Sequence, residues 1–314
     1  MVSLDDVLAA REAAAGRLER TPLFRSQTLS AIAGADVHLK AELFQKTGSF
    51  KPRGVLNNLA HLTPEQRERG VISISAGNHA QALAWGAAAE GIDALLVMWQ
   101  GASEVKIAAT RDYGATVDLE SHDPTEAYAR LADLVAETGR TLVHPFDHPL
   151  TIAGQGTVGL EVVEDLPETT TLIVPIGGGG LISGIAVAAQ GRRVIGVEPE
   201  LSPAMHEALA AGEPVAVEPR SIADGLSAPF AGTIALAMCR ELVERVVLVT
   251  ENEIEDAFRL LYARAKLACE PAAAVGVAAL LAGKIPLEPG ETAVAVVSGG
   301  NVATQTAVAI LGGR

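Results

Sequence analysis

Strand-like and helix-like segments alternate along almost the whole chain, and this order constrains the fold more than any other feature. Nine short apolar or β-branched segments predict strands at residues 38–42, 71–75, 94–98, 116–119, 141–144, 172–175, 194–197, 246–249 and 293–297. A strand that is followed by a helix and then by another strand favours a parallel sheet with helices on both faces. We therefore expect an α/β protein with mostly parallel open sheets.

Composition and charge exclude several classes of function. The 314 residues are 49% hydrophobic but only 4% aromatic, which is typical of a compact α/β enzyme large enough for two lobes. The net charge of −14 disfavours nucleic acid and anionic membranes as partners, because no basic run offsets it. Two cysteines without a nearby histidine cluster predict no disulfide framework and no structural zinc. With no apolar signal core at the amino terminus, we expect a reducing, cytoplasmic compartment.

Two uncharged stretches raise the question of membrane spans. Residues 169–191 and 292–313 are long enough to cross a bilayer. Each is divided by a glycine cluster into a strand and a helix. Both therefore predict interior units of sheet and helix.

Lys51 lies at a short corner between a predicted strand and a predicted helix at residues 55–62. Its flanks, Ser49-Phe50-Lys51-Pro52-Arg53-Gly54, include small residues that let a ligand approach closely. An amine held at such a corner is suited to form a Schiff base with a carbonyl cofactor. The alternative is a solvated lysine on a polar turn. The lysine at this corner makes an enzyme the leading hypothesis, and both interpretations stay open from the residues alone.

A second loop, Ser75-Ala76-Gly77-Asn78-His79, follows a predicted strand and opens a helix that runs to Ala89. The free N–H groups at the start of a helix attract anions, here a substrate carboxylate. The alternative role of Asn78 is a helix N-cap, which is worth about 1 kcal/mol.

The third loop holds four consecutive glycines, Gly177, Gly178, Gly179 and Gly180, between a strand and a helix. They expose successive N–H groups at the positive end of the helix, where a phosphate can be held. A dinucleotide-binding turn is the competing interpretation, because Glu198 ends the next strand at roughly the spacing of a ribose-binding acid. The glycine spacing fails that test, since the third required glycine would be Ile182 or Ser183. A loop that is merely flexible is the remaining alternative.

The chain resembles the fold type II pyridoxal-phosphate enzymes, specifically the branch of threonine/serine dehydratases and serine racemases. Besides the three loops, Ser298-Gly299-Gly300-Asn301 and the segments Arg20-Thr21-Pro22-Leu23, Ala153-Gly154-Gln155-Gly156-Thr157, Ala223-Asp224-Gly225 and Cys269-Glu270-Pro271 fall in the family's order. The resemblance covers nearly the whole chain. The chain ends just after its last predicted helix, and in this it resembles the short catabolic form of the family, which lacks the regulatory module of biosynthetic threonine dehydratases.

The resemblance implies a role for each of these residues. Lys51 holds pyridoxal phosphate, Gly177 to Gly180 bind its phosphate, Asn78 contacts its 3′-hydroxyl, and Phe50 and Gly225 belong to the same cofactor site. Residues Ser75 to His79 hold the substrate carboxylate. Ser298 faces the pyridine nitrogen, where a hydroxyl leaves the ring a weaker electron sink than an aspartate does. The alternative role of Ser298 is a helix cap.

The resemblance also implies an organisation. A two-lobed fold like that of the tryptophan synthase β chain is expected, with a large cofactor-binding domain at residues 1–65 and 146–314. A small mobile domain is expected at residues 66–145, with the active site in the cleft between them. A homodimer is implied by family resemblance alone.

Two departures from the family pattern bear on function. Serine racemases typically place a serine before Gly-Asn-His, but this chain has Ala76, which offers no second proton donor, so elimination by one base is favoured over racemisation. The family's cation site pairs a glutamate, here Glu198, with an aspartate at the position of Ala204. One carboxylate makes a poor Mg²⁺ or Ca²⁺ site, so no metal is expected and Glu198 is only a weak candidate. His206 nearby is expected to be a surface histidine.

We therefore predict a lyase that dehydrates and deaminates a β-hydroxy amino acid, L-threonine or L-serine above all, to a 2-oxo acid and ammonia. A serine racemase and a 3-hydroxyaspartate dehydratase are alternatives within the family. A nicotinamide-dependent oxidoreductase and a pyridoxal-phosphate-binding protein without turnover are alternatives from other classes. The sequence leaves open which side chains meet the β-substituent of the substrate.

Overall fold

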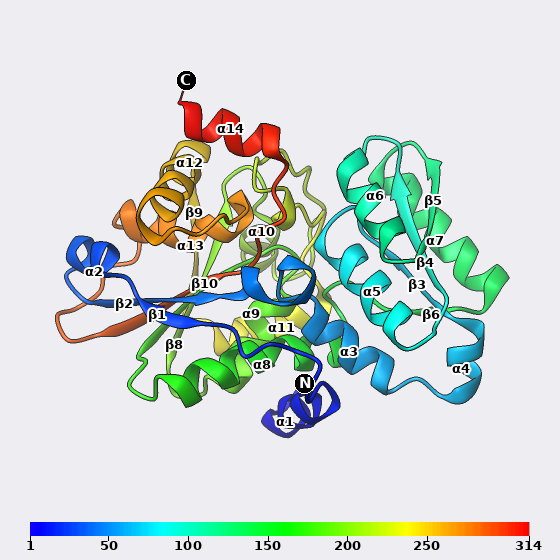
Figure 1. Cartoon of the computed structure of the whole chain (residues 1–314). Helices are drawn as coiled ribbons and strands as arrows, with labels where there is room; N and C mark the ends of the chain where they lie inside the picture. Colours follow the sequence, from blue (N-terminus) through cyan, green and yellow to red (C-terminus); the bar gives the residue numbers. More distant parts are fainter. Residues whose placement is uncertain (314) are drawn as a thin grey trace.

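The computed structural model describes residues 1–313 and divides their strands between two sheets (Figure 1). The strands are β1 Leu23–Arg25, β2 Asp36–Ala41, β3 Val71–Ile74, β4 Ala94–Trp99, β5 Thr116–Ser121, β6 Thr141–Leu142, β7 Thr171–Pro175, β8 Arg193–Pro199, β9 Arg245–Val249 and β10 Thr292–Val297. The six-stranded sheet has the order β1-β2-β10-β7-β8-β9, and the four-stranded sheet has the order β5-β4-β3-β6. β1 pairs with β2 in antiparallel fashion, and the other pairings of these strands are parallel. The predicted α/β class with mostly parallel sheets is confirmed.

Helices join the strands and cover the sheets. They are α1 Leu4–Ala13, α2 Gln27–Ala33, α3 Pro52–Ala60, α4 Pro64–Arg69, α5 Asn78–Ala89, α6 Glu104–Asp112, α7 Pro124–Thr138, α8 Pro149–Asp165, α9 Gly180–Ala188, α10 Ala204–Ala211, α11 Thr233–Leu242, α12 Glu251–Leu260, α13 Pro271–Leu281 and α14 Thr304–Gly312. Single turns of 3-10 helix form η1 Glu42–Phe44, η2 Lys46–Gly48 and η3 Asp224–Leu226, and η4 Leu261–Ala265 is a π-helical turn. None of the helices within residues 1–313 combines the length and apolar character needed to cross a membrane.

All nine predicted strands occur, with their ends moved by one or two residues. β2 begins at Asp36 rather than His38, and β6 ends at Leu142 rather than His144. The sequence did not predict β1, because a three-residue strand at an antiparallel edge is too short to show a pattern.

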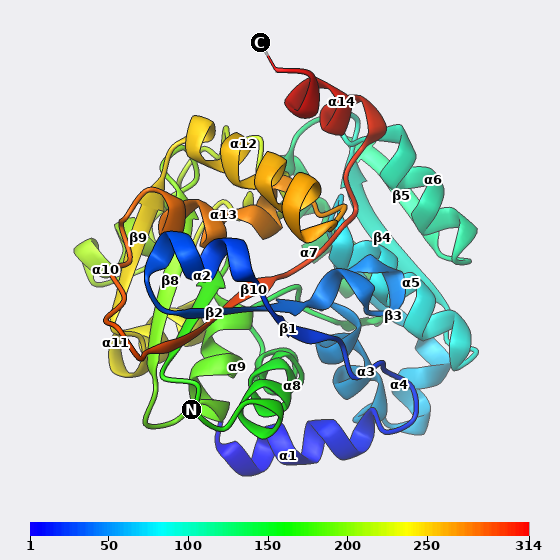
Figure 2. The same cartoon turned by 60° about the vertical axis from the view of Figure 1, so that its left-hand side comes forward.

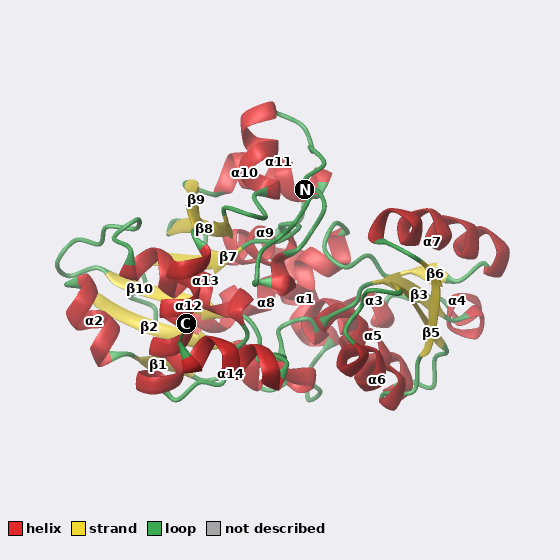
Figure 3. Cartoon of the chain, turned by 90° about the horizontal axis from the view of Figure 1, so that it is seen from above, coloured by secondary structure: helices red, strands yellow, loops and turns green. Residues whose placement is uncertain are grey.

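Each sheet lies between layers of helices. In the larger sheet, α2, α12 and α13 lie on one face and α8 and α9 on the other, with α1 outside α8 (Figure 2). In the smaller sheet, α7 covers one face and α5 and α6 the other (Figure 3). The strands β10 and β3 are buried along their whole length, which is why they are apolar apart from Thr292 and Ser73 and show no alternation.

The helix α3 connects the two halves of the structure. Its residues Val55 and Leu59 pack in the same apolar core as α5 of the smaller sheet, whereas its Arg53 is bonded to η1, directly after β2, and to α8 on a face of the larger sheet. The strands of the smaller sheet fall between residues 71 and 142. The exact domain boundaries at residues 65 and 145 stay a prediction.

Candidate active site

A pocket of about 500 Å³ lies between the two sheets, where several parallel strands end. The structure brings every predicted cofactor and substrate residue to its wall. They are Phe50, Lys51, Ser75, Ala76, Gly77, Asn78, His79, Gly177, Gly178, Gly179, Gly180, Gly225 and Ser298. The weak metal candidate Glu198 does not line it. Segments that lie more than 200 residues apart in the sequence thus meet at one site.

Backbone pairing fixes the corner that carries Lys51. The N–H group of Phe50 donates to the carbonyl oxygen of Ser298 at 3.1 Å, and Ser49 forms a bridge with Gly299. The turn just before it places Thr47 at φ 58° and Gly48 at φ 74°, in the left-handed region. The lysine corner and the loop after β10 therefore hold each other in place.

The Lys51 amine is buried beside a backbone carbonyl group and an aromatic ring. Its Nζ atom donates to the carbonyl oxygen of Pro145 at 2.9 Å and lies 5.2 Å from the centre of the Phe50 ring. Burial lowers the pKa of Lys51 to about 8, although the carboxylate of Glu270 acts in the opposite direction. A larger share of the amine is therefore unprotonated near neutral pH than in an ordinary lysine, which makes it a better nucleophile.

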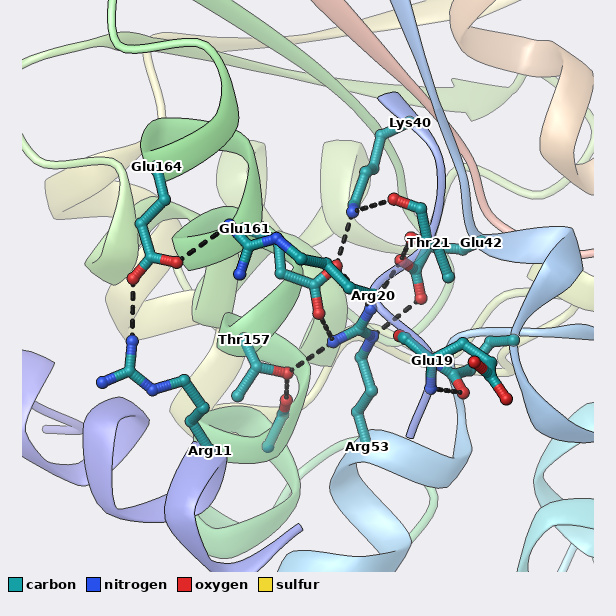
Figure 4. Close-up of polar contacts among 12 residues, drawn as sticks. Arg11, Glu19, Arg20, Thr21, Lys40, Glu42, Arg53, Thr157, Glu161 and Glu164 are labelled. Carbon is teal, nitrogen blue, oxygen red and sulfur yellow. Dashed lines mark hydrogen bonds and ion pairs between the residues drawn. The ribbon is translucent and has the colours of Figure 1, made fainter. Parts of the chain in front are cut away.

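Arg53 anchors the first turn of α3 to a buried cluster of charges (Figure 4). Its guanidinium donates to both oxygens of Glu42 at 2.8 Å and to both oxygens of Glu161 at 2.7 and 3.0 Å. It also donates to Thr157 at 3.1 Å, and Lys40 donates to Glu161 at 2.5 Å. Two cations thus balance two carboxylates in this cluster, which a buried set of charges requires. Because Arg53 follows Lys51 by two residues, the cluster fixes where the lysine corner sits.

Glycines allow α3 to approach α8 closely at the same place. An added Cβ atom would lie 2.5 Å from Nε2 of Gln155 at Gly54, and 2.5 Å from the carbonyl oxygen of Arg53 at Gly154. Real Cβ atoms do not come so close to other atoms. The glycines that follow Lys51 and open the Gly154-Gln155-Gly156 segment are therefore required by this helix contact.

The tetraglycine loop offers N–H groups to the pocket. Gly179 is at φ 95° and precedes α9, which begins at Gly180. Within residues 1–313, no backbone or side-chain acceptor faces the N–H groups of Gly177 to Gly180. A phosphate is the kind of group that such donors at a helix start can hold.

The glycines of this loop also have a packing role that the sequence did not show. An added Cβ at Gly178 would lie 2.3 Å from the ring of Phe146, and one at Gly180 would lie 2.6 Å from the Phe146 carbonyl oxygen. A side chain at Gly178 would therefore collide with Phe146 within the fold.

The loop at residues 75–79 leaves open space above the start of α5. An added Cβ at Gly77 would meet nothing within 4 Å, and the Ser75 hydroxyl accepts a hydrogen bond from the Gly77 N–H at 3.1 Å. His79 is buried, which lowers its pKa to about 3 and keeps the ring neutral. Its Nε2 atom lies 3.1 Å from the carbonyl oxygen of Val143 and therefore carries the hydrogen. The loop is thus fixed at His79 and open at Gly77.

The two cap alternatives from the sequence are wrong. The N-cap of α5 is Gly77, and Asn78 is the first helical residue. The Asn78 side chain instead contacts Glu270 and Asn301. Ser298 is buried at the pocket wall and caps no helix, because α14 begins only at Thr304.

Several pocket residues were not named from the sequence as site residues. They are Trp99, Lys106, Tyr128, Phe146, Gln155, Asp224 and Glu270. Lys106 on α6 forms an ion pair with Asp224 at the edge of the pocket. Glu270 belongs to a segment that we used only to support the resemblance, and its position after buried Cys269 was the available signal.

The Glu198 carboxylate is used within the fold. Its two oxygens each accept a 2.8 Å hydrogen bond, from the N–H groups of Met205 and His206 at the start of α10. Among residues 1–313, no group of three acidic, histidine or cysteine side chains could hold a metal ion. The His206 side chain is exposed, as predicted.

The donors and acceptors of this pocket fit pyridoxal phosphate. A weakly basic amine suits its aldehyde, and the free N–H groups of the tetraglycine loop suit its phosphate. The Asn78 amide and the Ser298 hydroxyl are polar groups at the wall between them.

Comparison with known proteins agrees with this geometry. Residues 15–299 match the family described as pyridoxal-phosphate dependent enzyme. The chain is 43% identical to an L-threonine ammonia-lyase of Thermotoga maritima, over 96% of this chain and 76% of that protein, and 41% identical to the L-threonine dehydratase catabolic TdcB of Escherichia coli, over 96% and 93%. A solved structure of maize serine racemase superposes with a TM-score of 0.93 at 36% identity, covering 97% of this chain and 95% of that one. With a lysine corner, a glycine loop and a pocket that suit one cofactor, and with a family match over most of its length, the chain belongs to the pyridoxal-phosphate dependent enzymes.

Proposed function

We propose that the protein is a threonine/serine ammonia-lyase, which eliminates water from L-threonine or L-serine and releases a 2-oxo acid and ammonia. The observation that carries this proposal is the buried amine of Lys51, facing a pocket that also contains an alanine, Ala76, in the substrate loop. The names of the relatives from Thermotoga maritima and Escherichia coli support the same reaction.

Three parts of the pocket have a task in this reaction: the Lys51 amine, the helix start at Asn78 and the glycine loop. When bound, pyridoxal phosphate supplies an electron sink that makes the α-proton of an amino acid acidic. Lys51 is the base that takes this proton, because its amine is the basic group of the pocket whose pKa is lowered towards neutrality. The helix start at Asn78 holds the substrate carboxylate with N–H groups, and the Gly177 to Gly180 loop holds the cofactor phosphate.

Ala76 supports elimination over racemisation. Inverting an amino acid with two bases needs a proton donor on the face opposite Lys51. The methyl group of Ala76 cannot donate a proton. A serine racemase is nevertheless the alternative function within the family, since the maize protein of that name shares the fold.

A panel of β-hydroxy amino acids tests the proposal. The protein is incubated with pyridoxal phosphate and L-threonine, L-serine or 3-hydroxyaspartate, and both 2-oxo acid and ammonia are measured. We expect equal amounts of the two products from L-threonine or L-serine, none from Lys51→Ala, and full turnover from Lys46→Ala, whose lysine pairs with Glu19 on the surface. Bound cofactor without either product would identify a binding protein, and D-serine as the main product would identify a racemase.

We also propose the features that the resemblance implies for the assembly. These are a homodimer, a cytoplasmic location, and a small domain at residues 66–145 that moves relative to the rest. Sedimentation tests the dimer. Proteolysis with and without L-serine tests the movement, since closure of the small domain would protect its linkers.

A further inference from the structure

Glu270 is a buried acid with one oxygen in use and one oxygen free. It lies just before α13, only 2% of it is exposed, and it forms part of the pocket wall. Its Oε1 atom accepts a 2.8 Å hydrogen bond from the Asn78 amide, whereas its Oε2 atom has no hydrogen-bond partner among residues 1–313. An unpartnered buried carboxylate oxygen is costly to the fold, so it calls for a functional explanation.

Glycines make the room that this carboxylate occupies. An added Cβ would lie 2.5 Å from Oε1 of Glu270 at Gly299 and 3.3 Å from it at Gly225. Gly299 follows the predicted cofactor residue Ser298, and Gly225 is itself a predicted cofactor residue. The carboxylate is therefore held between two segments that border the expected position of the cofactor.

A chain of amides fixes what Asn78 can offer to the pocket. The Nδ2 atom of Asn301 donates to the carbonyl oxygen of Thr47 at 2.7 Å and to Oδ1 of Asn78 at 2.8 Å. A backbone carbonyl only accepts, so this bond sets the orientation of the Asn301 amide. Oδ1 of Asn78 must then face Asn301, and its Nδ2 faces Glu270. Asn78 thus turns its N–H donors, and not its oxygen, toward Glu270.

We propose that Glu270 is a positioning residue that contacts bound pyridoxal phosphate through its free Oε2 atom, at the edge of the ring that faces Asn78, and holds an exchangeable proton there. The inference rests on the proposed function, because it takes the cofactor to occupy this pocket. Glu270 would hold a proton beside the cofactor ring, which is a role that none of the residues discussed above has.

The charges around Glu270 agree with a proton held on it. Burial and, after it, the negative charge of Asp224 raise the pKa of Glu270 to about 7, while Lys106, the Asn78 amide and Lys51 act in the opposite direction. The carboxyl group therefore changes charge near neutral pH. Below that pH, Oε2–H is a donor to the pocket, and above it both oxygens are acceptors.

The pH dependence of the bound cofactor's absorption spectrum tests the proposal. Wild-type protein loaded with pyridoxal phosphate is titrated from about pH 5.5 to about pH 9, and we expect a transition with a midpoint near 7. Glu270→Gln keeps an oxygen for Asn78 and places an amide donor where Oε2–H was. It should show the low-pH spectrum of the wild type throughout, with the transition removed or moved by about one pH unit or more.

Two further variants separate this role from a structural one. Asp224→Asn removes a negative charge that opposes ionisation of Glu270, so this variant should lower the midpoint of the spectral transition but keep the transition itself. Glu270→Ala should lose the transition and also bind pyridoxal phosphate more weakly, since Asn78 loses its acceptor; it gives a second measurement if the glutamine variant folds poorly. The same midpoint in wild type and in either Glu270 variant would overturn the inference. A wild type that binds no cofactor would instead refute the proposed function.

Discussion

The Nζ atom of Lys51 lies 2.9 Å from the carbonyl oxygen of Pro145, and the next residue, Phe146, packs against Gly178. One short segment after β6 therefore supports both the amine and the glycine loop. The distance between these two parts of the pocket is set by the ring of Phe146 and by the peptide before it. A change in this segment is expected to disturb both parts together.

Lys51 should be the residue that carries the cofactor. Borohydride reduction of the loaded protein should fix pyridoxal phosphate to the peptide that contains Lys51, as seen by mass spectrometry. Because the unprotonated amine is the nucleophile, the rate of attachment to the cofactor-free protein should rise as the pH increases through about 8. Lys46→Ala should be labelled normally, and label on Lys46 in the wild type would contradict the assignment.

A methyl group at Gly178 should be poorly tolerated. In Gly178→Ala the new Cβ would meet the Phe146 ring at 2.3 Å, so we expect a loss of about 3 kcal/mol in the free energy of unfolding and weaker cofactor binding. Denaturant unfolding and cofactor titration measure the two effects. The double variant Gly178→Ala, Phe146→Leu should recover part of the stability, while Gly312→Ala, with open space around its Cβ, should cost little. Wild-type affinity and stability in Gly178→Ala would show that Phe146 moves aside freely.

Removal of Arg53 should cost far more than removal of a surface ion pair. Arg53→Met removes the cation that faces Glu42, which keeps only the Thr21 hydroxyl, and leaves Glu161 with Lys40 alone, so we expect about 3 to 5 kcal/mol of destabilisation in urea unfolding. Arg220→Ala breaks an exposed pair with Glu218 and should change stability by less than about 0.5 kcal/mol. Similar values for the two variants would mean that the buried cluster is not a specific anchor.

The same cluster predicts the direction of a pH effect. Burial acts to raise the pKa of Glu161, but Arg53 and Lys40 outweigh it and leave the pKa below its ordinary value. The folded state then binds protons less readily than the unfolded state. The ionised Glu161 carboxylate therefore contributes to stability above the ordinary pKa of a glutamate, and this contribution is lost as the pH falls through the lowered pKa of the folded state. Arg53→Met should weaken this acid dependence of the unfolding midpoint.

Ala76 should determine the outcome for the α-carbon. Wild-type protein is expected to leave little D-enantiomer after partial turnover of L-serine, and Ala76→Ser should raise the racemised fraction, because its hydroxyl can return a proton to the opposite face. Chiral chromatography of the remaining amino acid measures both. Abundant D-serine from the wild type would mean that another group at the pocket protonates that face.

Chelation should have little effect on activity. Both oxygens of Glu198 already accept hydrogen bonds from α10, and Ala204 supplies no second carboxylate. Treatment with EDTA is expected to change the melting temperature and the rate of 2-oxo acid formation only slightly. A large loss that Mg²⁺ or Ca²⁺ restores would place a cation site here after all.

The sequence predicted local structure well wherever a pattern ran over several residues. Strands such as β3 and β10 are apolar apart from Ser73 and Thr292, so burial on both faces follows from their composition. The edge strand β1 lacks such a run, and its pairing with β2 depends on the chain folding back after residue 25. The sequence also identified three loops of the pocket, at Lys51, Asn78 and Gly177 to Gly180, because each combines small residues with the start of a helix.

The contacts between distant segments could not be predicted in the same way. Nothing in the spacing of residues says that Asn301 orients Asn78, or that Phe146 rests on Gly178. These contacts form where segments that follow strands of the two sheets meet. They explain why Glu270 was recognised as part of a motif but not as a polar group of the site.

The position of β10 has a consequence for the synthesis of the protein. This strand, encoded near the end of the chain, lies between β2 and β7 in the larger sheet, whereas the smaller sheet is complete once residue 142 has been made. A chain that emerges from the ribosome can thus form the smaller sheet early. Its larger sheet stays divided, with β2 lacking its parallel neighbour, until the last strand arrives. Lys51 is therefore translated long before Ser298, and the pocket is incomplete until that residue has been made. A chain that ends before residue 292 should have an ordered smaller sheet and bind no cofactor.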